Sequence, residues 1–248
     1  MFNTELHTMT LSEDGSYTAY SKEYEEHYHS TKDGALHESF VKHVLPAMKV
    51  KESQDEIVIL DICYGLGFNT LATLLYYKEK NLKSKLRIYS PELDEDLLKS
   101  LQNFTYPKEF ESLKNIIHDI SEYGVYEDEQ IYIEVYLGDA RAYVKTFENK
   151  FDIVYQDAFS PSVNPMLWTR EYFKDINRAI KKDALLTTYS ISLATRLALY
   201  ENDFNIYLNI GENYRDATIA SLSTLKNFKK VDMPHKISCN PDAKSLRD

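Results

Sequence analysis

The chain has 248 residues, of which 43% are hydrophobic, and its formal net charge at pH 7 is −10. This length allows one α/β domain with a small appendage, and the apolar content excludes a disordered chain. The acidic charge argues mildly against broad, nonspecific binding of nucleic acid, although it says little about any one local patch.

The sequence contains two cysteines, Cys63 and Cys239, which lie far apart. Their spacing predicts neither a disulfide framework nor a metal site, and it suits a reducing cytoplasm. The N-terminal stretch is neither basic nor apolar enough for a signal peptide, and no apolar run approaches the length of a membrane span. We therefore expect a cytoplasmic protein that holds no metal and is not embedded in a membrane.

The first 50 residues are expected to form a separate N-terminal extension. Residues 4–20 predict a β-hairpin, because Asp14-Gly15 is a favoured hairpin turn and separates two strand-like segments. Residues 35–48 show apolar side chains at helical spacing and predict a helix.

From residue 51 to residue 225, predicted strands alternate with predicted helices. This pattern indicates a doubly wound, mostly parallel sheet, whose ligands bind outside the carboxyl ends of the strands. The lysine-bearing residues 226–248 are expected to form a C-terminal tail that is at best partly ordered. The strands are expected at 56–62, 85–93, 130–139, 150–159, 183–190, 204–211 and 217–223. The helices are expected at 69–80, 94–104, 140–147, 169–180 and 193–202, with one helix or two short ones within 107–128.

The first of these strands ends in a glycine loop. Asp61 is followed by Gly65 and Gly67, and glycine allows a tight turn and a close approach of a ligand to the backbone. A dinucleotide-binding loop would have a third glycine where this chain has Thr70. The loop therefore favours a ligand without a diphosphate, such as S-adenosylmethionine, over a dinucleotide; a plain strand-to-helix turn is the alternative.

Acidic residues mark the next two strand ends. Glu92 is placed to accept hydrogen bonds from both ribose hydroxyls, and Asp139 from an adenine amino group. The alternatives are structural, since acidic residues favour the first turn of a helix and aspartate is a good N-cap. The glycine loop, Glu92 and Asp139 are each weak evidence for a cofactor site. Together they are stronger evidence, because one extended ligand would contact all three strand ends.

The fourth strand ends at Asp157 and continues into a loop stiffened by two prolines, Pro161 and Pro165. A stiff loop can hold side chains next to a transferable methyl group. The alternative is a rigid connection whose Phe159 and Trp168 only cover the core.

These motifs resemble those of the methyltransferase half of the bifunctional tRNA-modifying MnmC enzymes and their stand-alone relatives. The resemblance covers roughly residues 20 to 225, and the upstream segment with Tyr28 and Glu38 is also similar to the family's. The family's first-strand pattern is matched by Cys63, Tyr64, Gly65, Gly67 and Asn69, and its fourth-strand pattern by Asp157, Phe159, Pro161, Asn164, Pro165 and Trp168.

The resemblance implies a Rossmann-like class I methyltransferase with a seven-stranded sheet. It implies that S-adenosylmethionine is used to methylate the aminomethyl group of a wobble uridine in tRNA. A separate enzyme would supply that precursor, and we expect methyl transfer without the flavin-dependent oxidase activity of the bifunctional enzyme. Asp157 is expected to orient the amine, while the residues expected to hold the cofactor are Asp61, Cys63, Gly65, Gly67, Asn69, Glu92, Asp139, Tyr28 and Glu38.

Substrate contacts are expected from Phe159 and Tyr189, which can stack on the uracil, and from Pro161 and Arg215. Arg215 is what remains of a basic pair in the family, and Lys182-Asp183 replaces the family's two glycines before the fifth strand. Further candidates for phosphate contacts are Arg141, Arg170, Arg196, Lys226, Lys229, Lys230 and Lys236. Taken singly, each of them is better explained as part of an ordinary solvated surface.

Three alternative functions remain open on the sequence alone. One is a methyltransferase that acts on a small amine or other metabolite. The second is an aminopropyltransferase-like enzyme, which would show an additional acidic pocket for a polyamine. The third is a non-catalytic binding protein with a degenerate pocket on the same fold.

Overall fold

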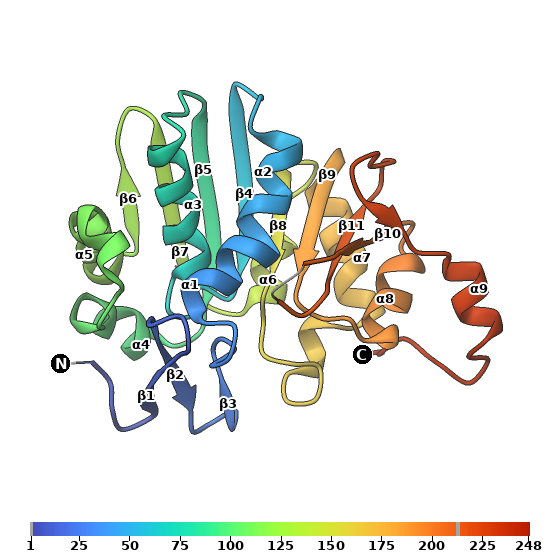
Figure 1. Ribbon diagram of the computed structural model, residues 1–248, viewed down its shortest axis with the longest axis horizontal. Helices are drawn as coiled ribbons and strands as arrows, with labels where there is room; N and C mark the ends of the chain where they lie inside the picture. Colours follow the sequence, from blue (N-terminus) through green and yellow to red (C-terminus); the bar gives the residue numbers. More distant parts are fainter. Residues whose placement is uncertain (1, 212–213) are drawn as a thin grey trace.

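The computed structural model describes residues 2–211 and 214–248. Its main sheet has nine strands within these residues, in the order β12-β10-β11-β9-β8-β4-β5-β7-β6 (Figure 1). The strands are β4 (Glu56–Ile62), β5 (Lys85–Glu92), β6 (Val125–Glu127), β7 (Ile131–Leu137), β8 (Phe151–Gln156), β9 (Ile180–Thr188), β10 (Asn205–Asn209), β11 (Ala217–Ser221) and β12 (Lys229–Lys230).

The five central strands, β9, β8, β4, β5 and β7, are parallel. The other strands of the sheet, including the β10–β11 hairpin, pair antiparallel with their neighbours. The predicted doubly wound, mostly parallel α/β fold is therefore confirmed, with two strands more than the seven expected. The additional strands β6 and β12 are too short to show a hydrophobic period, and β6 lies in a region predicted as helix.

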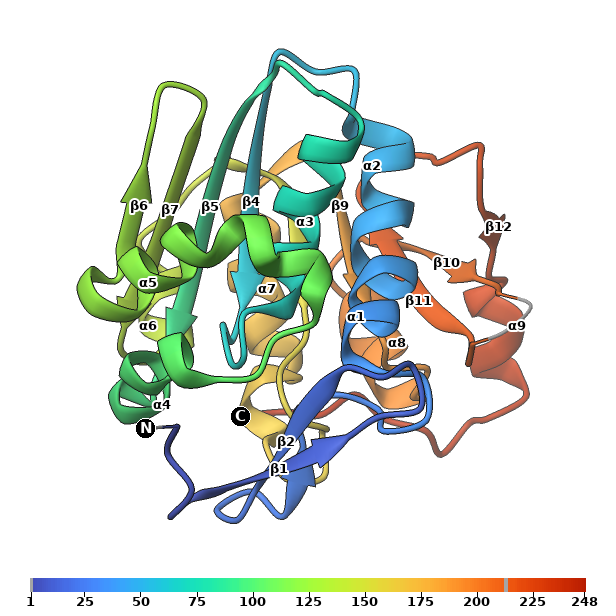
Figure 2. The same cartoon turned by 60° about the vertical axis from the view of Figure 1, so that its left-hand side comes forward.

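Apolar layers cover both faces of the sheet. Along β4, Ile57 and Ile59 point into one core, and Val58 and Leu60 into the other, as the two-residue period of a strand requires. Figure 2 shows α1, α2, α3 and α5 in front of the sheet and α7 and α8 behind it. The helices are α1 (Ala35–Glu38), α2 (Leu45–Lys51), α3 (Phe68–Glu79), α4 (Glu95–Ser100), α5 (Lys114–Tyr123), α6 (Ala140–Val144), α7 (Arg170–Ala179), α8 (Leu193–Tyr200) and α9 (Met233–Ser238), with 3₁₀ turns at Leu101–Asn103, Lys108–Leu113 and Pro165–Leu167.

The helix predicted over residues 35–48 consists of α1, a π-helical segment η1 (Ser39–Val44) and α2. Within this segment the backbone N–H of Leu45 bonds to the carbonyl of Phe40, five residues back. Pro46 follows Leu45 and has no N–H, so it cannot donate an α-helical hydrogen bond to the residue four positions back. The π-helical segment thus lies where the α-helical hydrogen bonding is interrupted.

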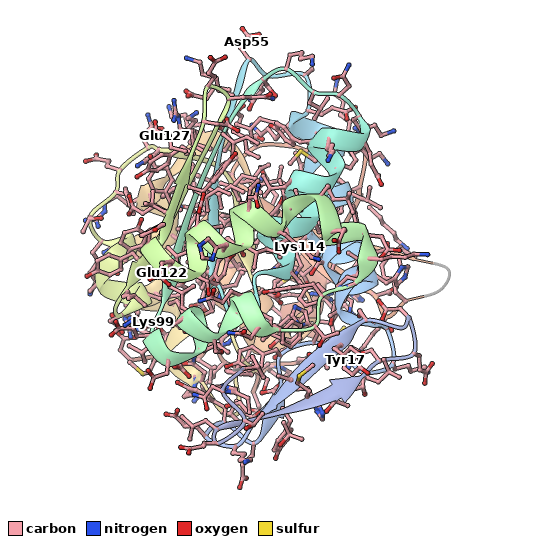
Figure 3. All side chains as sticks on the ribbon, turned by 90° about the vertical axis from the view of Figure 1, so that its left-hand side faces the viewer. Tyr17, Asp55, Lys99, Lys114, Glu122 and Glu127 are labelled. Atoms are coloured by element: carbon pink, nitrogen blue, oxygen red, sulfur yellow. The ribbon has the colours of Figure 1, made fainter. Side chains whose placement is uncertain are left out.

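A small N-terminal sheet covers one end of the main sheet. It contains β1 (His7–Leu11), β2 (Tyr17–Ser21) and β3 (Glu26–His27), and the β1–β2 pair is the predicted hairpin. In Figure 3, Tyr17 on β2 lies at the opposite end of the molecule from Asp55, which directly precedes β4. The N-terminal sheet therefore lies at the carboxyl ends of the parallel strands.

The C-terminal residues are more ordered than predicted. They form β12 and α9, and the chain end packs on α7, where the N–H of Arg170 bonds to the carbonyl of Leu246. The Asp248 carboxylate accepts hydrogen bonds from Thr169 (2.7 Å) and Arg141 (2.6 Å). Ion pairs and backbone hydrogen bonds of this kind leave no apolar pattern in the sequence, so periodicity does not predict β12 and α9. No helix in residues 2–211 and 214–248 has the length and apolarity that crossing a bilayer requires.

Substitution of Gly67 by alanine should destabilise the fold. Gly67 has φ +76° at the start of α3, and a Cβ there would lie 2.8 Å from the Tyr64 ring. Left-handed backbone and overpacking each cost about 1–2 kcal/mol. Urea unfolding should therefore show a larger loss for Gly67→Ala than for the control Gly15→Ala, where φ is +84° but the space is open. Equal losses would show that the contact with Tyr64 is unimportant.

Candidate functional site

A cavity of about 900 Å³ lies between the carboxyl ends of the central strands and the N-terminal sheet. Its volume falls within the range typical of small-molecule sites. Seven residues of its wall come from the central strand ends and the segments after them: Cys63, Gly65, Glu92, Asp139, Asp157, Phe159 and Tyr189. The N-terminal segment contributes Tyr28 and Glu38, and the segment before β11 contributes Arg215.

The loop after β4 has an unusual backbone. Cys63, Gly65 and Gly67 all adopt positive φ, at 67°, 54° and 76°. A Cβ on Gly65 would lie 3.0 Å from the Tyr28 ring, so the close approach of Tyr28 requires glycine. Gly65 also donates its N–H to Glu92, at 2.7 Å, which ties the first and second strand ends together.

Beneath this loop, Thr70 takes the place of the third glycine of a dinucleotide loop. Its hydroxyl donates a hydrogen bond of 2.8 Å to Asp61, which is 1% exposed. Burial raises the pKa of Asp61 to about 7, against the opposing effect of Thr70. Asp61, Gly67 and Asn69 do not line the cavity. They lie behind the loop that forms its wall.

Glu92 and Asp139 line the cavity, but both also have structural partners. The Glu92 carboxylate accepts the N–H groups of Gly65, Leu93 and Asp94 at 2.7–2.8 Å. A carboxylate can accept about four hydrogen bonds, so one more donor can be accommodated. Burial raises the pKa of Glu92 although these donors oppose it. Asp139 caps α6 by accepting the N–H of Ala142, as its structural alternative predicted.

The Asp157 carboxylate lies at the centre of the site. It accepts a hydrogen bond from the Asn69 amide (2.8 Å) and lies 3.3 Å from Nε2 of the buried His43. Burial acts to raise the pKa of Asp157, but His43, His29 and Asn69 together outweigh burial and hold that pKa below its ordinary value. Asp157 is therefore an ionised acceptor that borders the cavity.

Aromatic side chains form the wall next to Asp157. The Phe159 ring stacks on the Tyr24 ring, with 4.6 Å between the ring centroids. The centroid of the Tyr28 ring lies 4.9 Å from that of Phe159. The indole of Trp168 is buried and donates to the carbonyl of Phe159, so it holds the loop from behind. Tyr189 borders the cavity and donates to the carbonyl of Ala158. Pro161 does not line the cavity.

On the opposite wall, Glu38 accepts hydrogen bonds from two protein groups. It accepts the N–H of Ser30 at 2.7 Å and the ammonium of Lys42 at 2.6 Å. Lys42 also pairs with Asp33. Sequence reasoning missed Tyr24, His29, Lys42 and His43, because they belong to no motif that it considered.

The cavity is strongly acidic. Of its three lysine and arginine residues, Lys42 pairs with Glu38 and Asp33, and Arg141 pairs with Asp248. Among the other basic candidates, Arg170 pairs with Glu201 and Arg196 donates to Thr218. Such a surface attracts cations and repels phosphate. The acidic residues that line the cavity are Glu23, Glu26, Asp33, Glu38, Glu92, Asp94, Glu95, Asp96, Asp139 and Asp157.

The Thr70–Asp61 bond gives a pH-dependent prediction. The pKa of Asp61 in the folded chain is about 7. In the folded protein, Asp61 is therefore mainly protonated below pH 7 and mainly ionised above it. The hydrogen bond from Thr70 stabilises the fold most above pH 7, because it is then made to a charged carboxylate. Thr70→Val should lower the free energy of unfolding by about 1–3 kcal/mol at pH 8.5, and by less at pH 5.5.

The matched control is Thr73→Val on the same helix. The Thr73 hydroxyl donates to the carbonyl of Asn69 and contacts no carboxylate. Urea unfolding of Thr73→Val should show a loss that does not vary between these pH values. A pH-independent loss for Thr70→Val would contradict the assignment of its role to Asp61.

Known proteins show similarity in both sequence and structure. Residues 103–222 match a family described as S-adenosyl-L-methionine-dependent methyltransferase. The crystal structure of MnmC2 from Aquifex aeolicus superposes with a TM-score of 0.82 and 31% identity, over 98% of this chain and 79% of that one.

Two relatives in sequence are longer than this chain. An uncharacterized protein of Methanocaldococcus jannaschii is 32% identical over 206 residues, which cover 82% of this chain and 55% of the relative. The bifunctional MnmC protein of Paracidovorax citrulli, named for tRNA 5-methylaminomethyl-2-thiouridine biosynthesis, is 30% identical over 60% of this chain and 25% of its own length. The chain thus spans about half of the first and a quarter of the second. With its fold and the match to MnmC2, the chain belongs to the MnmC-like methyltransferases and is an S-adenosylmethionine-dependent methyltransferase.

Proposed function

We propose that this protein transfers a methyl group from S-adenosylmethionine to the 5-aminomethyl group of a wobble uridine or 2-thiouridine in tRNA, and so forms the 5-methylaminomethyl group. The observation that carries the proposal is the ionised Asp157 carboxylate, which borders the cavity beside an aromatic wall. The similarity to MnmC proteins, whose name specifies 5-methylaminomethyl-2-thiouridine biosynthesis in tRNA, supports the same substrate.

The wall of the cavity offers a consistent place for the cofactor. In this proposal a ribose hydroxyl donates to Glu92, the adenine lies near Asp139, and the methionyl part follows the loop at Cys63 and Gly65. Support comes from the common edge on which these groups lie, and from the remaining acceptor capacity of Glu92. Asp61, Gly67 and Asn69 then serve the cofactor indirectly, through the shape of the loop, while Tyr28 packs against Gly65.

The acceptor amine needs a free lone pair in line with the sulfonium methyl group. An alkylamine of ordinary pKa, near about 10.4, is mostly protonated at neutral pH. Asp157 can accept hydrogen bonds from the ammonium and take its proton, while positioning supplies a large part of the acceleration. Phe159 and Tyr189 offer surfaces on which a splayed uracil can stack. In this proposal Arg215 contacts the RNA at the rim, and Pro161 acts only by stiffening the loop.

One observation favours a second candidate, a methyltransferase for a small amine. The acidic residues around the cavity attract a cationic amine but repel the phosphates of RNA. The two candidates share the chemistry at Asp157 and differ in what carries the amine.

Methyl transfer is tested with labelled S-adenosylmethionine and tRNA from cells that lack wobble-uridine methylation. We expect label in tRNA, and nucleoside analysis should locate it in 5-methylaminomethyl-uridine or its 2-thio form. Label that enters only small amines, and never tRNA, would replace the proposed substrate by the second candidate.

Asp157→Asn should lower the turnover number by about 10²–10⁴-fold, because it removes the acceptor for the amine proton. Calorimetry should show that this variant still binds S-adenosylmethionine. The matched control is Asp152→Asn, which changes a buried aspartate at the other end of the same strand. Asp152→Asn should retain turnover when folded. Unchanged turnover in Asp157→Asn would remove Asp157 from the reaction.

A further inference from the structure

Two buried aspartates at neighbouring strand ends differ in their acid strength. Asp61 on β4 and Asp157 after β8 share the amide of Asn69, at 3.5 and 2.8 Å. Burial raises the pKa of Asp61 to about 7. The Asp157 side chain is more open, at 12% exposed against 1% for Asp61, and its pKa lies below the ordinary value. His43 is the largest influence that opposes burial at Asp157, and His29 and Asn69 act in the same direction.

The geometry around His43 directs its ring at Asp157. His43 is 0% exposed, and its Nδ1 lies 2.9 Å from the hydroxyl of Thr187 on β9. Its Nε2 lies 3.3 Å from Oδ1 of Asp157. The residue comes from the π-helical segment η1, and such segments are frequent at functional sites. His43 does not line the cavity, so it acts on a ligand only through Asp157.

One tautomer directs each ring nitrogen at a neighbour, although the 3.3 Å contact of Nε2 with Asp157 lacks the geometry of a hydrogen bond. If the Thr187 hydroxyl donates to Nδ1, the remaining ring proton is on Nε2 and points toward Asp157. The hydrogen bond at one ring nitrogen thus sets which way the other nitrogen presents its proton. Other titratable groups that face this pair are Asp61, His29 and Tyr155.

We propose that His43 is a positioning residue for methyl transfer, which keeps Asp157 ionised and oriented so that this carboxylate can take the proton of the acceptor ammonium. This inference rests on one part of the proposed function, namely that the group which is methylated is an amine. One proton passes from the ammonium to Asp157. The freed nitrogen lone pair forms the N–C bond to the methyl group, and the electron pair of the broken C–S bond stays on sulfur.

Without His43, the largest influence that opposes burial is lost, so the pKa of Asp157 should rise. A carboxyl group whose pKa has risen is ionised in a smaller fraction of molecules at pH 6 than at pH 8.5. Turnover that depends on ionised Asp157 should fall in the same proportion. A histidine that served only the packing of the core would change turnover by the same factor at every pH.

The experiment compares two polar variants of His43 in the complete chain. His43→Asn keeps a polar group near Thr187 but removes the one that faces Asp157, and His43→Gln keeps a donor that can reach Asp157. Relative to the unchanged protein, His43→Asn should lose turnover most at pH 6, less at pH 7 and least at pH 8.5. His43→Gln should follow the profile of the unchanged protein closely. Equal profiles for the two variants, or a loss that is uniform across pH, would overturn the proposal.

A second measurement needs no substrate. Carbon NMR of carboxyl-labelled aspartate should show the pKa of Asp157 raised in His43→Asn and nearly unchanged in His43→Gln. If the unchanged protein methylates no amine in tRNA, the proposed function fails while this titration still tests the His43–Asp157 pair. An Asp157 pKa that is the same in His43→Asn as in the unchanged protein would contradict the role of His43.

Discussion

The site depends on the burial of carboxylates at one edge of the parallel sheet. Asp61, Glu92 and Asp157 follow one another across three adjacent strand ends, and each is at least largely shielded from water. Buried carboxylates are costly unless they accept hydrogen bonds. Each therefore recruits donors, and the donors come from segments far apart in the chain: the helix start after β4, the loop after β5, and the N-terminal helix.

This requirement explains why the N-terminal segment belongs to the site. The central strands place acidic side chains at a common edge, but they supply few donors of their own. η1 brings His43 under Asp157, and the preceding chain brings Tyr28 against Gly65. Residues of the same segment line the cavity on the side away from the strand ends. Through His43 and Asp157, the packing of residues 2–51 is thus linked to the wall of the cavity.

Much of the fold is predictable because its central strands are continuous apolar runs. Residues 56–62 illustrate this: the predicted strand and β4 have the same limits. The sequence also indicates where Glu92, Asp139 and Asp157 lie, because parallel strand ends share an edge. It does not indicate their partners. Glu92 accepts three backbone N–H groups that no side-chain pattern reveals, and the partner of Asp157 is a histidine in a helix that reads as an ordinary amphipathic one. The β12–α9 region is equally hidden, since polar contacts anchor it.

The central claim is that one cavity holds the cofactor beside the acceptor site at Asp157. A crystal structure of the protein with S-adenosylhomocysteine tests this claim most directly. The account predicts that the ribose contacts Glu92, that the adenine lies near Asp139, and that the sulfur faces the space bordered by Asp157 and Phe159. S-adenosylhomocysteine bound with its sulfur turned away from Asp157, or outside this cavity, would contradict it.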